Sequence, residues 1–447
     1  MSTKIVIIGA GSGFGGRLSI DIMATEALKD ATICLCDIHE GRLDKVYRYV
    51  KRTVERHNLP TKIVASTDRR ALLAGADFVV TSISVGGGAY YGFPYSAEVG
   101  IPRKYGIDQS VADTTSVGAV FRFLRTGPVQ QQILDDVGDL CPGALVLNHT
   151  NPMCMLSWLH LVKSNLRYVG LCHGIQWTSS ELAKKVGVPV EEITYNVAGI
   201  NHLAWFLEIK HKGKDLYPLI RKTLADPEKR KGEEVRYEIM KQFGYFCTES
   251  NRHDSEYMPY FRRTPELMKQ FKLESRTVPD KPHEREWTKQ TGLSDEEQAA
   301  AATLQRSNEY TTRIIEAVLT NVPYAFNGNV LNRGLITNLP DGCCVEAPCL
   351  VDAYGIHPCH VGDLPPQLAA LNRTNVNVHE LGVRAVLEQS REHAFHACAV
   401  DPVAAATLPL HTIREMFDEL WKAEEDAGLL EWFNPKHKGP LPERCAE

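Results

Sequence analysis

Two short segments place a thiol and two imidazoles where they could bind a transition metal. Cys172 and His173 stand in Val-Gly-Leu-Cys-His-Gly (169–174), and His202 stands in Gly-Ile-Asn-His-Leu (199–203). Each segment begins with an apolar, strand-like run, and thiolate and imidazole suit divalent transition metals. The segments therefore indicate a candidate metal site, with a hydrogen-bonded core histidine as the alternative at His202.

A glycine-rich turn near the start of the chain indicates a dinucleotide site. A predicted strand, residues 4–8, runs into a turn that contains Gly9, Gly11, Ser12, Gly13 and Phe14, and a predicted helix follows. Glycines let the backbone approach a pyrophosphate, and the helix N-terminus offers free N–H groups. Phe14 replaces the third glycine when the fingerprint is counted from Gly9, whereas the pattern counted from Gly11 is complete. A purely structural turn is the alternative.

Polar side chains at two further strand ends extend the predicted nucleotide site. Asp37 ends the second predicted strand, where its carboxylate would accept hydrogen bonds from a ribose and repel a 2′-phosphate, which favours NAD over NADP. Asn148 and Asn151 lie in Asn-His-Thr-Asn-Pro at the end of a later strand, where they could orient the cofactor carboxamide or a substrate hydroxyl. A loop carboxylate and a turn before a helix are the respective alternatives.

The elements that would position these residues alternate in the first half of the chain. Short β-branched runs and helical patterns follow one another, which predicts parallel βαβ units, with strands at 4–8, 32–36, 62–65, 78–82 and 144–147 and helices at 14–28 and 42–57. The second half is richer in helical patterns, at 233–243, 295–320 and 379–398, with strands at 198–209 and 345–349. We expect a mobile surface loop at 271–289 and a turn-rich loop near a ligand at 328–342.

Length and composition narrow the class of protein. The 447 residues favour two lobes, which we place at 1–195 and 196–447. A net charge of −5 argues against a nucleic-acid partner, and the lack of a long apolar run argues against a membrane span. The first eight residues enter a strand without a signal-peptide pattern, so we expect a cytoplasmic protein whose 12 cysteines stay reduced.

Ordered motifs along the chain resemble glycoside hydrolase family 4, the NAD- and Mn-dependent glycosidases, and are closest to its α-galactosidase (melibiase) branch. The motifs include Val111-Ala-Asp113-Thr, Asn148-His-Thr-Asn151-Pro-Met, Gly170-Leu-Cys172-His173-Gly, Gly244-Tyr-Phe-Cys-Thr-Glu249-Ser and Glu256-Tyr257-Met-Pro. The resemblance implies an α/β fold, with a Rossmann-type doubly wound parallel sheet plus a C-terminal α+β catalytic domain, similar to lactate and malate dehydrogenases. It also implies a homodimer or homotetramer.

The resemblance implies roles around a metal. Cys172 and His202 become the protein ligands of a Mn²⁺-like ion, which leaves positions open for substrate hydroxyls and water. Asn151 is expected to bind substrate hydroxyls. Relatives that act on phosphorylated sugars have Asn where this chain has His173, so His173 points to a non-phosphorylated glycoside and is expected to contact it.

The resemblance also implies groups that transfer protons. Tyr257 matches the tyrosine base of several members, and Glu249 matches the aspartate of another branch, with Arg252 three residues on as a substrate contact. A phenol beside a divalent cation has a lowered pKa, which suits a base. Asp113 matches an acidic residue that assists proton transfer. Packing is the alternative role for Tyr257, and capping of a predicted helix at 114–125 is the alternative for Asp113.

The implied reaction is hydrolysis of an α-glycoside by oxidation at C3, deprotonation at C2, elimination, addition of water and re-reduction, so that NAD is recycled. Cys-His-Gly at Gly174 stands where the melibiase branch has Cys-His-Ser and resembles α-glucosidase and α-glucuronidase members. Those activities and α-galacturonidase therefore remain alternatives to the favoured α-galactosidase. The thiol and imidazole argue against a 2-hydroxyacid dehydrogenase and against a non-catalytic NAD sensor.

Overall fold

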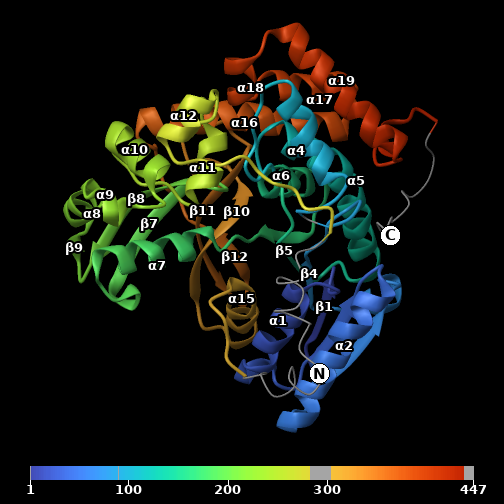
Figure 1. The fold of residues 1–447 in the computed structure, drawn as a ribbon. Helices are drawn as coiled ribbons and strands as arrows, with labels where there is room; N and C mark the ends of the chain where they lie inside the picture. The colour runs from blue at the N-terminus through green and yellow to red at the C-terminus, as the bar shows by residue number, and fades with distance from the viewer. Residues whose placement is uncertain (1, 89, 282–303, 437–447) are drawn as a thin grey trace.

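The computed structural model describes residues 2–88, 90–281 and 304–436, and these build the α/β fold of Figure 1. A single mixed sheet of 12 strands runs through it, in the order β3-β2-β1-β4-β5-β6-β10-β11-β7-β8-β9, with β12 paired to β11. Because the strands of the first half are joined by helices and those of the second by hairpins, the sheet changes from parallel to antiparallel pairing along its width.

The parallel half has the strand order 3-2-1-4-5-6 of a dinucleotide-binding fold, and it confirms the predicted alternation. Apart from the edge strand β3, which is partly exposed, its strands are mostly buried apolar runs, as expected where helices cover both faces. They are β1 (Lys4–Ile8), β2 (Thr32–Cys36), β3 (Lys62–Ser66), β4 (Phe78–Thr81), β5 (Leu145–Asn148) and β6 (Arg167–Gly170). The linking helices include α1 (Gly13–Met23), α2 (Glu40–His57), α5 (Val117–Leu140) and α6 (Met153–Lys163).

The antiparallel half continues the same sheet. Asn329 of β10 pairs with Gly170 of β6 and with Glu346 of β11, and Glu346 pairs with Gly199 of β7. One row of paired residues thus crosses from the parallel half to the antiparallel half. The strands are β7 (Ile193–Ile200), β8 (Leu203–His211), β9 (Lys214–Asp215), β10 (Tyr324–Leu331), β11 (Cys344–Asp352) and β12 (Gly355–Pro358). The lobe boundary predicted at residue 195 falls inside β7, and the division into two lobes stays a prediction.

Helices of the C-terminal third form a separate layer with a second apolar core, seen in red at the top of Figure 1. They pack on α5 and on α4 (Tyr95–Lys104), and they are α16 (Pro366–Leu387), α17 (Arg391–Ala399), α18 (Pro402–Thr407) and α19 (Leu410–Asp426). Further helices lie beside β7 and β8, among them α7 (Gly174–Val186), α10 (Glu234–Phe243) and α11 (Asn251–Tyr257). No helix of the described ranges is long and apolar enough to cross a membrane.

The prediction of one strand over 198–209 is wrong, and the error is important for the site. The segment is a hairpin in which Ile200 pairs with Leu203, so that Asn201 and His202 form its turn. His202 has φ +63°, a left-handed conformation that glycine and asparagine adopt most easily. The apolar run continues across the turn, and this continuity conceals it in the sequence.

Other boundaries differ from the prediction at capping positions. The helix predicted at 379–398 is divided between α16 and α17, with Gln389 at φ +51° between them. The helix predicted at 14–28 ends at Met23, and a short 3₁₀ turn follows at Glu26–Leu28. The helix predicted at 295–320 is α15 (Tyr310–Thr320) where it is described, because residues 295–303 lie outside the described ranges.

Residues 328–331 belong to β10 rather than to the predicted loop. The predicted loop at 271–289 is described only as far as residue 281, where it has no regular structure.

Candidate active site

The structure brings Cys172 and His202 together at the junction between the two halves of the sheet. Cys172 follows β6 and precedes α7, and His202 is the turn residue between β7 and β8. A third ligand-type side chain, Glu249, reaches them because residues 246–248 run beside β8. The N–H of Phe206 donates to the carbonyl of Phe246, and the N–H of Thr248 donates to the carbonyl of Ala204, both at 2.9 Å.

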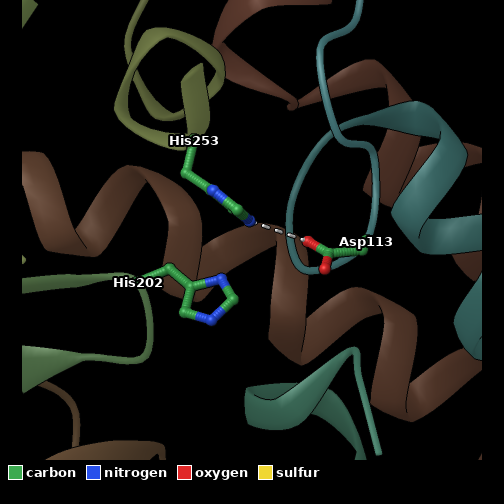
Figure 2. A group of neighbouring side chains, drawn as sticks. All are labelled: Asp113, His202 and His253. Atoms are coloured by element: carbon green, nitrogen blue, oxygen red, sulfur yellow. Dashed lines mark ion pairs between the residues drawn. The ribbon is translucent and has the colours of Figure 1, made fainter. Parts of the chain in front are cut away.

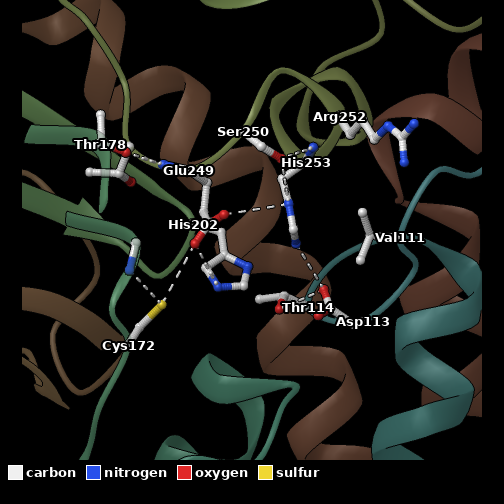
Figure 3. A network of polar contacts seen from close by, with 12 residues as sticks. Val111, Asp113, Thr114, Cys172, Thr178, His202, Glu249, Ser250, Arg252 and His253 are labelled. Atoms are coloured by element: carbon white, nitrogen blue, oxygen red, sulfur yellow. Dashed lines mark hydrogen bonds and ion pairs between the residues drawn. The ribbon is translucent and has the colours of Figure 1, made fainter. Parts of the chain in front are cut away.

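The three side chains form a compact group, shown in Figure 3. Cys172 Sγ lies 3.8 Å from Glu249 Oε1, and His202 Nε2 lies 3.5 Å from the same oxygen. Two ligands bound to one ion at about 2.0–2.3 Å each lie no more than about 4.6 Å apart, so these separations fit a metal. His202 Nδ1 is buried and has no hydrogen-bond partner among the described residues. Thiol, imidazole and carboxylate are a donor set for a divalent transition metal.

A second group, Asp113, His202 and His253, adjoins the first (Figure 2). His253 Nε2 lies 3.4 Å from Asp113 Oδ1, and the rings of His202 and His253 are 4.7 Å apart at their centroids. His253 Nδ1 lies 3.5 Å from Glu249 Oε2, so one imidazole lies between two carboxylates. His253 was not among the site residues predicted from the sequence. The signal that could have identified it is the four-residue spacing between Glu249 and His253, at the end of the motif that begins at Gly244.

Asp113 holds a network of its own. Tyr90 Oη donates to Asp113 Oδ2 at 2.8 Å, and Asn151 Nδ2 donates to the same oxygen at 3.1 Å. The cap alternative for Asp113 is wrong, because α5 begins at Val117 and Ser116 occupies the capping position. Asp113 is therefore a buried carboxylate that orients His253, Tyr90 and Asn151 around one point.

Burial and charge set opposing pKa shifts in these groups. Burial, together with Glu249 and Glu346, raises the pKa of Cys172 well above its usual value. Burial opposes ionisation of Glu249, but His202, His253 and His173 outweigh it and hold the pKa of Glu249 low. Burial also disfavours a charged His253, yet Glu249 and Asp113 raise the pKa of His253 to about 10. The site thus gathers negative and electron-rich groups that a bound cation would stabilise.

The remaining predicted residues lie at different distances from this centre. Tyr257 on α11 is 1% exposed, and its hydroxyl donates to the carbonyl of Asn201 at 3.2 Å. Burial raises its pKa well above the usual phenol value. His173 is an exposed side chain, with Nδ1 3.6 Å from Glu309 Oε1. Arg252 points away from the cluster in Figure 3 and lies 3.9 Å from the exposed Glu274.

The glycine turn at β1 has the backbone of a phosphate-binding loop. Gly9 has φ +85°, and a Cβ there would lie 2.0 Å from the carbonyl oxygen of Ser82. Ser12 caps α1, since its hydroxyl accepts from the N–H of Gly15 at 3.4 Å. A Cβ at Gly15 would lie 2.3 Å from the carbonyl oxygen of Ala10, so Gly15 is the glycine that lets the helix pack closely on the turn. Gly13 begins α1.

Asp37, Asn148 and Phe14 also have contacts within the protein. Asp37 Oδ2 accepts from the N–H of Gly11 at 2.8 Å, so the carboxylate holds the turn as well as ending β2. Asn148 is fully buried, and its side chain bonds Thr81, Gln130, Thr150 and Met153. Phe14 packs on His149, with centroids 4.6 Å apart. Binding of the cofactor by these three residues stays a prediction, and the turn itself fits a dinucleotide.

The fold and the two sites define a class: a dinucleotide-binding α/β protein with a candidate metal centre at the end of its parallel sheet. The sequence profile of "Family 4 glycosyl hydrolase" matches residues 4–188, and that of "Family 4 glycosyl hydrolase C-terminal domain" matches residues 197–404. The chain therefore belongs to glycoside hydrolase family 4, and it is a glycoside hydrolase, as the motifs predict.

Individual relatives agree with this membership. An alpha-galactosidase of Bacillus subtilis is 40% identical over 95% of this chain and 98% of its own length, and one of Rhizobium meliloti is 34% identical over 95% and 88%. These matches agree with the predicted likeness to the α-galactosidase branch. The structure of a 6-phospho-alpha-glucosidase from gut microorganisms in complex with NAD and Mn²⁺ superposes with a TM-score of 0.78, at 20% identity, over 95% of this chain and 98% of its own.

Proposed function

We propose that this protein is an NAD- and Mn-dependent α-glycosidase that hydrolyses non-phosphorylated α-galactosides. The observation that carries the proposal is the position of the Cys172–His202–Glu249 group. It lies where the parallel and antiparallel halves of the sheet meet, and the parallel half carries the dinucleotide turn at the end of β1. The alpha-galactosidase relatives support the sugar, and the NAD and Mn²⁺ of the 6-phospho-alpha-glucosidase support the cofactors.

In this proposal the bound groups supply hydride transfer at C3 and polarisation of the resulting carbonyl, which makes the C2 proton acidic. The chain's own residues do the rest. Cys172 and His202 hold the metal, and Asn151, fixed by Asp113, binds a sugar hydroxyl. His173, exposed at the start of α7, occupies the position where relatives acting on phosphosugars have Asn, and we propose that it contacts the sugar.

Two side chains compete for removal of the C2 proton. The family resemblance supports Tyr257, whose hydroxyl is bonded to a backbone carbonyl in a fully buried position. The second is His253, whose ring stands against the metal-ligand candidate His202 and lies between Asp113 and Glu249. These carboxylates raise the pKa of His253 to about 10, so His253 is protonated near neutral pH and suits an acid rather than a base. We therefore propose Tyr257 as the C2 base, with a bound cation favouring its phenolate, and His253 with Asp113 as the pair that donates a proton to the leaving oxygen.

One assay tests the proposed function. Release of nitrophenol is measured from p-nitrophenyl α-galactoside, α-glucoside, α-glucuronide and α-galacturonide, with and without NAD⁺, Mn²⁺ and reductant. We expect hydrolysis of the α-galactoside that needs both additions and stops with chelator. Failure on all four glycosides under complete conditions would reject the function, and a preference for another sugar would correct the substrate.

We also propose a cytoplasmic homodimer or homotetramer. The family resemblance supports the assembly, and the free thiols of the described cysteines support the compartment. Light scattering on the purified protein checks the assembly. A monomeric mass would reject this part of the proposal and leave the proposed reaction untouched.

A further inference from the structure

Glu249 has a backbone conformation that its residue type does not favour. Its φ is +72°, in the left-handed region that costs a non-glycine residue about 1–2 kcal/mol. Neighbouring groups hold this conformation from both sides. The N–H of Glu249 donates to Thr178 Oγ1 at 3.1 Å, and its carbonyl accepts from the guanidinium of Arg236. Arg236 is itself buried and paired with Glu233 at 2.6 Å.

Gly174 provides the space that the carboxylate occupies. A Cβ on Gly174 would lie 2.3 Å from Glu249 Oε1 and 3.1 Å from its carboxyl carbon. A serine or alanine at this position would therefore displace the carboxylate. The backbone N–H of Gly174 also donates to Cys172 Sγ at 3.4 Å, so the residue beside the thiol both supports the sulfur and makes room for Glu249.

Both oxygens of the Glu249 carboxylate already have neighbours. Oε1 faces Cys172 Sγ at 3.8 Å and His202 Nε2 at 3.5 Å, and Oε2 faces His253 Nδ1 at 3.5 Å. Accepting a substrate proton would need an oxygen that turns toward the sugar, whereas Oε1 points at the two metal-ligand candidates (Figure 3). The hydrogen-bonded backbone of Glu249, the space beside Gly174 and the orientation of Oε1 all suit a metal ligand better than a base.

We propose that Glu249 is a third protein ligand of the metal, admitted to the site by Gly174. The inference rests on the proposed function for the presence of a metal at Cys172 and His202. Three protein ligands would hold the ion and would leave its other positions to sugar hydroxyls and water. The metal is then held in the absence of substrate, and Gly174 belongs to the metal site rather than to sugar selection.

Mn²⁺ binding in the absence of substrate tests the inference. The dissociation constant is measured by titration calorimetry, and free Mn²⁺ is followed by electron paramagnetic resonance, with NAD⁺ present. We expect Glu249→Gln and Gly174→Ala each to weaken binding at least tenfold. The double variant should be little worse than either single variant, since both remove the same contact. Glu274→Gln, which alters an 84% exposed carboxylate nearby, should bind Mn²⁺ as the parent protein does.

Glu249→Gly keeps the test independent of folding, because glycine adopts φ +72° without strain. We expect this variant to fold with an unchanged or higher melting temperature and to bind Mn²⁺ at least tenfold more weakly. Unchanged Mn²⁺ affinity in Glu249→Gln and Glu249→Gly would overturn the third-ligand inference and leave the proposed function standing. Lack of Mn²⁺ binding by the parent protein would overturn both.

Discussion

The dinucleotide turn and the metal-ligand group lie on one sheet but are built in opposite ways. The turn comes from consecutive residues, and its chemistry is mainly that of the backbone: a left-handed glycine, a capped helix and free N–H groups. The metal-ligand group comes from three segments far apart in the chain, and its chemistry is that of side chains. A local site can be identified from spacing, whereas an assembled site depends on the tertiary fold.

The difference also concerns which substitutions each region tolerates. At the turn, an added Cβ would meet backbone at Gly9 and Gly15, and it would meet the side chain of Asp37 at Gly11. In the metal-ligand group, the constraint is on the type of donor atom, together with the space that Gly174 leaves for Glu249. The two regions should therefore respond separately to substitution, and four experiments test this separation.

Cys172→Ser should have the largest effect. The substitution removes a proposed metal ligand, and we expect at least about a 10³-fold loss of glycosidase activity, because metal polarisation supplies several kcal/mol to such reactions. NAD⁺ affinity, measured by fluorescence titration, should stay within about threefold. A metal-responsive, active variant would reject Cys172 as a ligand, and a parallel loss of NAD⁺ binding would break the separation of the two regions.

Gly9→Ala is the reverse experiment. The new Cβ would lie 2.0 Å from the carbonyl oxygen of Ser82, and φ +85° adds strain, so the turn must move. We expect NAD⁺ binding to weaken about 100-fold, which corresponds to about 2.7 kcal/mol. Mn²⁺ binding, measured by calorimetry without NAD⁺, should be unchanged. Retained NAD⁺ affinity would show that the turn does not bind the dinucleotide.

His253→Gln and Tyr257→Phe sharpen the comparison inside the metal-ligand region. Removal of a general base costs about 10²–10⁴-fold in rate. We expect a loss of about 10²-fold or more in kcat for Tyr257→Phe, which removes the proposed base, and a smaller loss for His253→Gln, which removes the proposed proton donor. The exchange of the sugar C2 proton with deuterated solvent gives a second readout. Exchange of the C2 proton that persists in Tyr257→Phe and stops in His253→Gln would assign the base to His253.

Asp37→Ser should have the smallest effect. It removes the charge that would repel a 2′-phosphate, and we expect the preference for NAD⁺ over NADP⁺ to fall about tenfold with little change in Mn²⁺ binding. Measured affinities for both nucleotides check this. Because Asp37 also accepts from the N–H of Gly11, Asp37→Asn serves as the control that keeps a hydrogen-bond acceptor while removing the charge.

Local patterns predicted much of the nucleotide region. Lys4–Ile8 and Thr32–Cys36 are confirmed to the residue, because buried strands between turns have unmistakable ends. The sequence did not predict features that depend on contacts between residues far apart in the chain. The turn at Asn201 and His202 interrupts an apolar run without a proline, and Asp113 meets His253 only through tertiary packing.

The contact between Glu249 and Gly174 is a second feature that the sequence alone does not predict. The motifs identified both positions, yet their relation is steric and no spacing rule expresses it. Gly174 was predicted to bear on the choice of sugar, whereas the structure places the Glu249 carboxylate in the space beside it. Fold class and most predicted site positions thus follow from the sequence, and the roles of side chains that share one space require coordinates.

The row of paired residues through Gly170, Asn329, Glu346 and Gly199 has a consequence for the catalytic cycle. Because hydrogen-bonded strands connect the two halves without a linker, the distance between nicotinamide and metal would be set by the sheet. A hydride removed from the sugar and later returned to it would then travel the same short path twice. In the proposed reaction the cycle would therefore close without a domain movement, and the oxidised sugar would stay where it was formed.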